Sequence, residues 1–100
     1  MSKIIFSVSY EIIPEKRKEY LALMKRVQKW INSTTNQNYT VYEDADRPNL
    51  MTEVFYLDSE KDVEEVKRLQ KKKPDSLFEK TNQYILNLEQ VAYRTFNEII

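Results

Sequence analysis

The spacing of apolar residues in this chain changes period several times, and the order of those changes limits the folds open to it. From 4 to 12 every second residue is apolar, which predicts a β-strand over that segment. Pro14 follows at a position suited to the first turn of a helix. Beyond it the apolar residues recur every three or four positions. This spacing predicts an amphipathic helix whose apolar stripe contains Tyr20, Leu23, Met24, Val27, Trp30 and Ile31.

A β-hairpin is the next predicted unit. The segments 39–43 and 50–57 are rich in aromatic and β-branched residues, as strands usually are. The connection between them contains the turn-forming residues Asp44, Pro48 and Asn49. The polar loop 32–38 before the hairpin contains no glycine. We therefore expect Asn32 or Asn36 to be the left-handed residue that ends the helix.

The second half of the chain predicts another helix and a last strand. Ser59 followed by Asp62 resembles a capping box at a helix start, and Pro74 is expected to stop or kink that helix. An irregular helical piece is expected over 75–86. Alternating apolar residues then predict a strand over 91–96.

The resulting order is β-α-β-β-α-β within a single domain, 1–100. This order predicts an α+β, ferredoxin-like fold, in which a four-stranded antiparallel sheet carries both helices on one face. Right-handed crossovers would place the strands 4–12 and 50–57 at the centre. The uncovered face would be apolar, which predicts a second subunit as its cover. Depending on how the strand 50–57 is turned, that face contains Leu50, Val54 and Tyr56 or Met51, Phe55 and Leu57.

Glycine, histidine and cysteine are all missing from the sequence. Without glycine the chain cannot form a phosphate-binding loop of the Walker or dinucleotide type. Without histidine and cysteine it lacks the usual ligands of zinc, haem and iron–sulfur clusters. The acidic turn around Asp44 and Asp46 lacks the glycine and the distal glutamate of an EF-hand loop. We therefore expect no metal and no cofactor.

Acidic and basic residues balance at 16 each, which argues against binding to nucleic acid or to a membrane surface. RNA-recognition domains share the same element order, but their signature strand needs glycines and a basic residue, which 50–56 lacks. The basic cluster of Arg68 and 71–73 is interpreted as a solvated helix end. No segment has the pattern of a signal peptide or a membrane span, so a cytoplasmic location is expected.

Three stretches resemble segments of a known family. They are the charged run 14–20 after the first strand, the turn 43–49, and the stretch 52–60, which leads from Glu53 and an aromatic residue into an acidic helix start. In them the chain resembles the dimeric α+β barrel superfamily, in particular antibiotic-biosynthesis-monooxygenase-like domains. The resemblance implies a homodimer whose two sheets form a barrel. It also implies a pocket in each subunit between the sheet and the helices.

The chain departs from that family at the positions of its chemistry. Family members that degrade haem or oxidise quinols depend on an asparagine, a tryptophan and a histidine around one cavity. This sequence has no histidine, and Val8 stands where the first strand would carry the asparagine. Glu15 also stands where the family usually has glycine. That chemistry is therefore not carried over to this chain.

Glu53 is the one charged residue inside an otherwise apolar strand. If it faces a pocket, it is a desolvated carboxylate with a raised pKa, suited to act as a general base or to anchor a ligand. In the alternative interpretation it pairs with Arg94 or Lys3 on neighbouring strands, or lies at the subunit interface.

Aromatic side chains with polar tips suit a pocket for a small, flat, oxygenated ligand, although the same residues can form an ordinary core. The candidates are Tyr10, Trp30, Phe55 and Tyr84. Two functions remain open. One is a cofactor-free oxygenase or isomerase-like enzyme with Glu53 as its base. The other is a non-catalytic ligand-binding or protein-interaction domain of the same fold, which the missing histidine favours.

Overall fold

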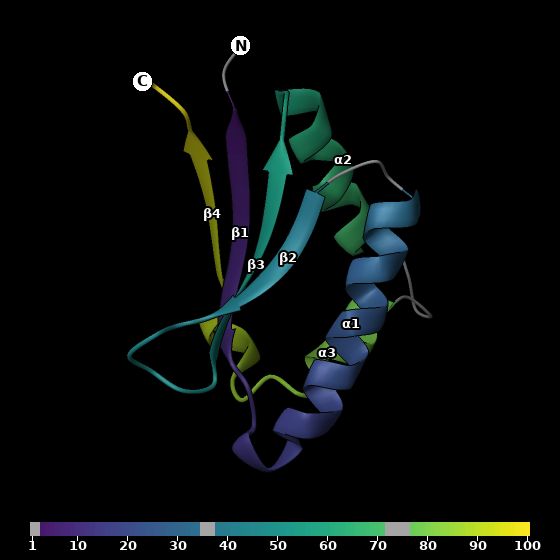
Figure 1. Ribbon diagram of the computed structural model, residues 1–100, viewed down its shortest axis with the longest axis vertical. Coiled ribbons are helices and arrows are strands. Elements are labelled where there is room, and N and C mark those ends of the chain that lie inside the picture. Colours follow the sequence, from purple (N-terminus) through teal and green to yellow (C-terminus); the bar gives the residue numbers. More distant parts are fainter. Residues whose placement is uncertain (1–2, 35–37, 72–76) are drawn as a thin grey trace.

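In the computed structural model, which describes residues 3–34, 38–71 and 77–100, four strands form one antiparallel sheet (Figure 1). They are β1 (Ile4–Glu11), β2 (Asn38–Glu43), β3 (Leu50–Leu57) and β4 (Ala92–Asn97). Their order across the sheet is β2-β3-β1-β4, with the two predicted central strands at the centre. The helices α1 (Arg17–Thr34), α2 (Glu60–Lys71) and α3 (Leu77–Asn82) lie on one face of the sheet (Figure 1). The predicted ferredoxin-like α+β fold is confirmed.

The first helix begins where the sequence places it. Pro14 opens a short 3-10 turn, η1 (Pro14–Lys16), which leads directly into α1. Its missing N–H costs nothing there, because the first N–H groups of a helix have no partner within the helix. The predicted apolar stripe faces the sheet and is buried, apart from the half-buried Trp30. Burial of that stripe holds α1 against the sheet.

A cluster of polar contacts ties the β2–β3 hairpin to the start of α1. The guanidinium of Arg17 donates two hydrogen bonds to the carboxylate of Glu43, and Arg17 Nη1 donates a third to Asn49 Oδ1 at 3.0 Å. The N–H of Asn49 donates to Glu43 Oε2 at 2.8 Å. Asn49 also has a φ of 70°, the left-handed conformation that a side-chain amide tolerates well.

The left-handed conformation predicted for the end of the first helix is not found at Asn32, the described one of its two candidates. Asn32 does not adopt a positive φ; instead its Oδ1 accepts a hydrogen bond from the N–H of Tyr39 at 3.1 Å. It thus connects the end of α1 to the first residues of β2. Position 36 lies outside the described residues.

The second half follows the predicted order with shorter elements. The Ser59 side chain accepts a hydrogen bond from the N–H of Asp62 at 3.3 Å, as one half of a capping box does. Pro74 lies outside the described residues. The helical piece expected over 75–86 is observed as α3 alone, because Ile85 forms a β-bridge with Ile12 and leaves the helical path. A second 3-10 turn, η2 (Leu88–Gln90), then leads into β4.

Strand register decides which residues face the helices. Odd positions of β3 point to the helices, so Glu53 lies beside Val8 of β1 and Val41 of β2 on that side. Even positions of β3 point to the uncovered face. That face therefore displays the first of the two predicted sets, Leu50, Val54 and Tyr56, together with Thr52. Within the described residues, no helix is long and apolar enough to cross a membrane.

Candidate functional site

The helix-covered face contains a buried carboxyl group held by two tyrosines. Glu53, in the middle of β3, is 4% exposed. Tyr10 of β1 donates its hydroxyl to Glu53 Oε2 at 2.6 Å, and Tyr39 of β2 donates to Oε1 at 2.6 Å. Such short O–H···O distances are typical of hydrogen bonds to a charged acceptor. Each carboxyl oxygen thus has a donor, as a buried polar group requires.

A third tyrosine extends this network onto α1. The hydroxyl of Tyr20 lies 2.8 Å from that of Tyr10. Because the single proton of the Tyr10 hydroxyl points to Glu53, Tyr20 is the donor in this pair. The rings of Tyr10 and Tyr20 meet edge to face at 6.1 Å, and Tyr20 meets Tyr84 in the same way at 6.4 Å. We call Glu53, Tyr10, Tyr39 and Tyr20 the carboxyl–tyrosine cluster.

Burial away from solvent raises the pKa values of all four groups in the cluster. Burial raises the pKa of Glu53, and the hydrogen bonds from Tyr10 and Tyr39 act in the opposite direction. Burial, with the nearby Glu53 carboxyl, also raises the pKa of Tyr10 and of Tyr39. The pKa of Tyr20 is raised by burial as well. The three hydroxyls therefore remain proton donors at neutral pH.

The partners of Glu53 differ from those that the sequence suggested. Arg94 lies on the uncovered face, with its guanidinium 5.1 Å from the ring centre of Phe96. Lys3 pairs with Asp58 at 3.4 Å. Of the two interpretations left open for Glu53, the structure shows a desolvated carboxyl group, whose partners are phenol hydroxyls and not cations.

All four predicted pocket residues lie in or against the core, and three of them, Tyr10, Phe55 and Tyr84, belong to or contact the carboxyl–tyrosine cluster. Phe55 packs on Tyr39 with ring centres 4.7 Å apart, Tyr84 packs on Tyr20, and Trp30 lies half-buried at the core edge. The sequence analysis missed Tyr39 and Tyr20 as partners of Glu53. A signal for both was present, because a tyrosine at a core-facing position needs a partner for its hydroxyl.

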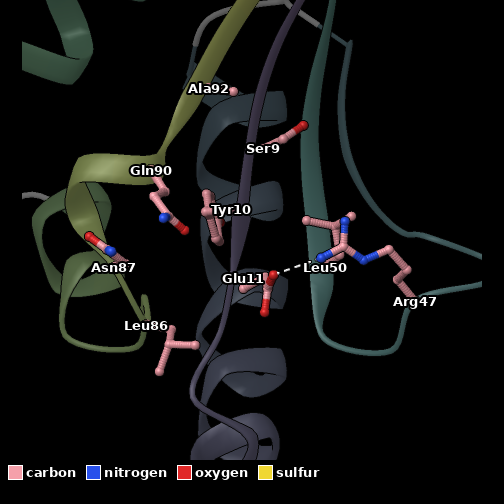
Figure 2. A pocket seen from close by; sticks show the side chains of 9 residues that line it. All are labelled: Ser9, Tyr10, Glu11, Arg47, Leu50, Leu86, Asn87, Gln90 and Ala92. Atoms are coloured by element: carbon pink, nitrogen blue, oxygen red, sulfur yellow. Dashed lines mark hydrogen bonds and ion pairs between the residues drawn. The ribbon is translucent and has the colours of Figure 1, made fainter.

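A separate pocket of about 410 Å³ lies at one end of the uncovered face (Figure 2). Ser9, Glu11, Leu50 and Ala92 line it from three neighbouring strands, and register places all four on this face. Tyr10 also contributes to its lining and so belongs to both sites. The remaining lining residues come from the hairpin loop and from the segment before β4: Arg47, Leu86, Asn87 and Gln90.

The pocket combines apolar walls with polar groups that have no net charge. Leu50 and Leu86 contribute apolar surface from opposite sides (Figure 2). Glu11 and Arg47 form an ion pair of 2.9 Å, made through a single guanidinium nitrogen. Asn87 uses its side-chain oxygen to accept the N–H of Glu89 at 3.0 Å, which leaves the amide NH₂ group as a donor. The lining therefore suits a small molecule with an apolar body and oxygen acceptors.

Beyond the pocket, the uncovered face is less apolar than the sequence predicted, because small polar residues lie on it beside the aromatic ones. Ser9 and Thr52 join their hydroxyls at 2.9 Å across β1 and β3. Tyr42 and Tyr56 join theirs at 2.7 Å, with 50% and 40% of each residue exposed. Phe96 of β4 is also exposed. Within the described ranges, no three acidic side chains gather in a way that could hold a metal ion.

Comparisons with known proteins support the fold. No protein-family model and no curated protein matches this sequence. A conserved protein from Methanosarcina mazei Go1 has a similar structure, with a TM-score of 0.74 and 16% identity, over 96% of this chain and 92% of that one. Rv0793 from Mycobacterium tuberculosis has a TM-score of 0.71 and 14% identity, over 98% and 96%. At these identities the similarity shows the fold alone.

Proposed function

We propose that this protein is a homodimeric small-molecule-binding domain whose ligand occupies the pocket on the uncovered sheet face. The pocket itself is the observation that supports this function best. Its volume of about 410 Å³ lies in the range of known ligand sites, and it combines leucine walls with a few polar groups. A flat, uncharged, oxygenated aromatic molecule fits that lining.

The uncovered face supports the dimer. Helices cover the opposite face only, which leaves Tyr42, Tyr56 and Phe96 exposed on this one. Exposed aromatic residues on one contiguous surface are typical of protein interfaces. Two such faces packed together would form the barrel that the resemblance to dimeric α+β barrel domains implies.

Ligand binding can be tested by filling the pocket. Ala92 lines it from the edge strand β4, so Ala92→Trp would occupy its volume without entering the core. The neighbouring Tyr93 points to the other face, which makes Tyr93→Trp a matched control. With 1-naphthol, hydroquinone and riboflavin as probes, we expect a saturable rise in Tm for at least one. The rise should persist in the control and vanish in Ala92→Trp. A rise that survives Ala92→Trp, or none with any probe, contradicts the proposal.

A second candidate function is proton abstraction by Glu53, the enzyme-like alternative. A buried carboxyl with a raised pKa, 2.6 Å from two phenol hydroxyls, is the observation that favours it. It ranks second because both carboxyl oxygens already accept hydrogen bonds and the residue is almost fully buried. Oxygen uptake with hydroquinone, measured for the wild type and Glu53→Gln, separates the two functions. Uptake that this substitution abolishes supports the enzyme; probe binding without uptake in either protein supports the binding domain.

A further inference from the structure

The pocket lies on the same face that the proposed dimer would bury, and this has a consequence for its shape. If a second copy covers the face, then residues of that copy must close the open side of the pocket. The residues at the two ends of the sheet are the candidates for that closure. The inference therefore rests on the proposed homodimer and deepens it.

The described residues include two exposed apolar pairs at opposite ends of the sheet. Leu86, which is 57% exposed, lines the pocket, and the similarly exposed Leu88 is the first residue of η2. Ile99, which is 89% exposed, and the fully exposed Ile100 follow β4 at the other end, near the start of β1 (Figure 1). Exposing four large aliphatic side chains to water is unfavourable, so these pairs are candidates for burial against another surface.

If two open faces pack about a two-fold axis perpendicular to the strands, these pairs would come together. Such an axis packs the two open faces with their strands running in opposite directions, so that each end of one sheet lies over the opposite end of the other. The register of β1 with β4 separates these ends, because Ser9 pairs with Ala92 near the pocket and Ile4 pairs with Asn97 near the isoleucines. Five residues of strand span about 17 Å.

Charge is complementary in the same arrangement. Glu98 precedes the two isoleucines, and its N–H donates to the carbonyl oxygen of Lys3 at 2.8 Å, which fixes where the segment leaves the sheet. Arg47 at the pocket rim has an exposed guanidinium that contacts Glu11 through a single nitrogen. It therefore has further N–H donors for a second carboxylate.

We propose that the pocket is a composite site, in which residues 98–100 of the partner protomer form the missing wall. The isoleucines of one copy cover the leucines of the other, and Glu98 pairs across the interface with Arg47. A ligand would then be enclosed between two protomers, each dimer holding two equivalent sites.

The absence of cysteine from the sequence allows a direct test. The double variant Leu86→Cys with Ile99→Cys should form an intermolecular disulfide under mild oxidation, since a disulfide requires Cα atoms within about 7 Å. Non-reducing electrophoresis should show a product of twice 12.1 kDa. Each single variant is the control, because a single cysteine cross-links to its own copy only if that residue lies near the two-fold axis.

Sedimentation of the wild-type protein separates failure of this inference from failure of the proposed dimer. A dimer in solution together with efficient cross-linking of the double variant supports the composite site. A dimer whose double variant does not cross-link, or whose Ile99→Cys variant cross-links alone, overturns the composite site and leaves the dimer standing. A monomer overturns both. As a second readout, a probe that binds the wild type should bind Ile100→Asp about tenfold more weakly. Unchanged affinity contradicts the composite site.

Discussion

Tyrosines of the same strand lie in opposite environments on the two faces of the sheet, buried on one face and exposed on the other. Tyr39 of β2 faces the helices and donates its hydroxyl to the buried Glu53. Tyr42, on the other face of β2, joins the hydroxyl of Tyr56 while half exposed. A shift of one position in a strand exchanges the two environments. The covered face contains a closed polar network within an apolar core, whereas the uncovered face has exposed aromatic residues and a pocket.

Removing the centre of the covered network should have the largest effect on stability. Glu53→Ala would leave a cavity and deprive Tyr10 and Tyr39 of their acceptor, which should cost about 3 kcal/mol of unfolding free energy. Thr52→Ala, at the next position of β3 on the uncovered face, is the control and should cost less than about 1 kcal/mol. Urea unfolding measures both. Equal losses would show that the two faces do not differ as described.

Removing one donor tests the network at its periphery. Tyr39→Phe should cost about 2 kcal/mol, because a hydrogen bond to a buried carboxyl is lost. Tyr20→Phe should cost about 1 kcal/mol, since it removes a bond between two neutral hydroxyls. Urea unfolding of the two variants, measured side by side, gives the order. A smaller loss for Tyr39→Phe than for Tyr20→Phe contradicts the assigned roles.

The pKa of Glu53 predicts a pH dependence of stability. Because this pKa is raised in the folded protein, the folded state binds a proton that the unfolded state releases above pH ~4.3. Stability should therefore fall as pH rises from ~4.3 to the folded pKa, and then level off. Unfolding free energies across this range for wild type and Glu53→Gln test the assignment. The slope should be smaller in the variant; an unchanged slope assigns the titration to another group.

The contact between Arg17 and Glu43 predicts the opposite behaviour in acid. The hydrogen bonds from Arg17 and from the Asn49 N–H lower the pKa of Glu43 to about 2. Its contribution is complete above the unfolded pKa of ~4.3 and is lost as pH falls through about 2. Glu43→Gln and Arg17→Gln should each reduce Tm above pH 4.3. Near pH 2 the Tm of each variant should approach that of the wild type. Additive losses in the double variant would show that the pair does not act as a unit.

The smallest expected change in unfolding free energy is that of Tyr93→Phe. It distinguishes the effect of burial from the effect of the sheet face. Tyr93 of β4 lies on the same face as Tyr39, but it is on the edge strand and 62% exposed. Its hydroxyl can reach water, so Tyr93→Phe should change the unfolding free energy by less than about 0.5 kcal/mol. A loss similar to that of Tyr39→Phe in the same urea experiment would mean that the face alone, and not desolvation, sets the cost.

Local patterns were sufficient to predict the order of elements, and tertiary contacts explain what was missed. The alternation over 4–12 and the turn before Leu50 produced the correct strands, because both depend on neighbours in sequence. The burial of Glu53 was also accessible from its apolar strand. The end of α3 was not, because the bridge between Ile12 and Ile85 joins residues far apart in the chain.

The pocket was beyond sequence reasoning for the same reason. Leu86 and Asn87 have no periodic pattern, and they reach the pocket only because the Leu86 N–H donates to the carbonyl oxygen of Glu11 at 2.8 Å. The tyrosine partners of Glu53 depend on strand register, which brings Tyr10 and Tyr39 to it from both sides. The residue pattern within one strand does not determine how three strands align with one another.

We propose that the uncovered face of the sheet is the working face, and that a second copy covers it. Sedimentation equilibrium of the wild-type protein from about 1 to 100 μM tests this proposal, since that range detects dimers with association free energies of roughly 5 to 8 kcal/mol. We expect a species of twice 12.1 kDa that dissociates when Tyr56→Asp places a charge on that face. A mass of 12.1 kDa at every concentration, or a dimer that Tyr56→Asp leaves intact, would contradict it.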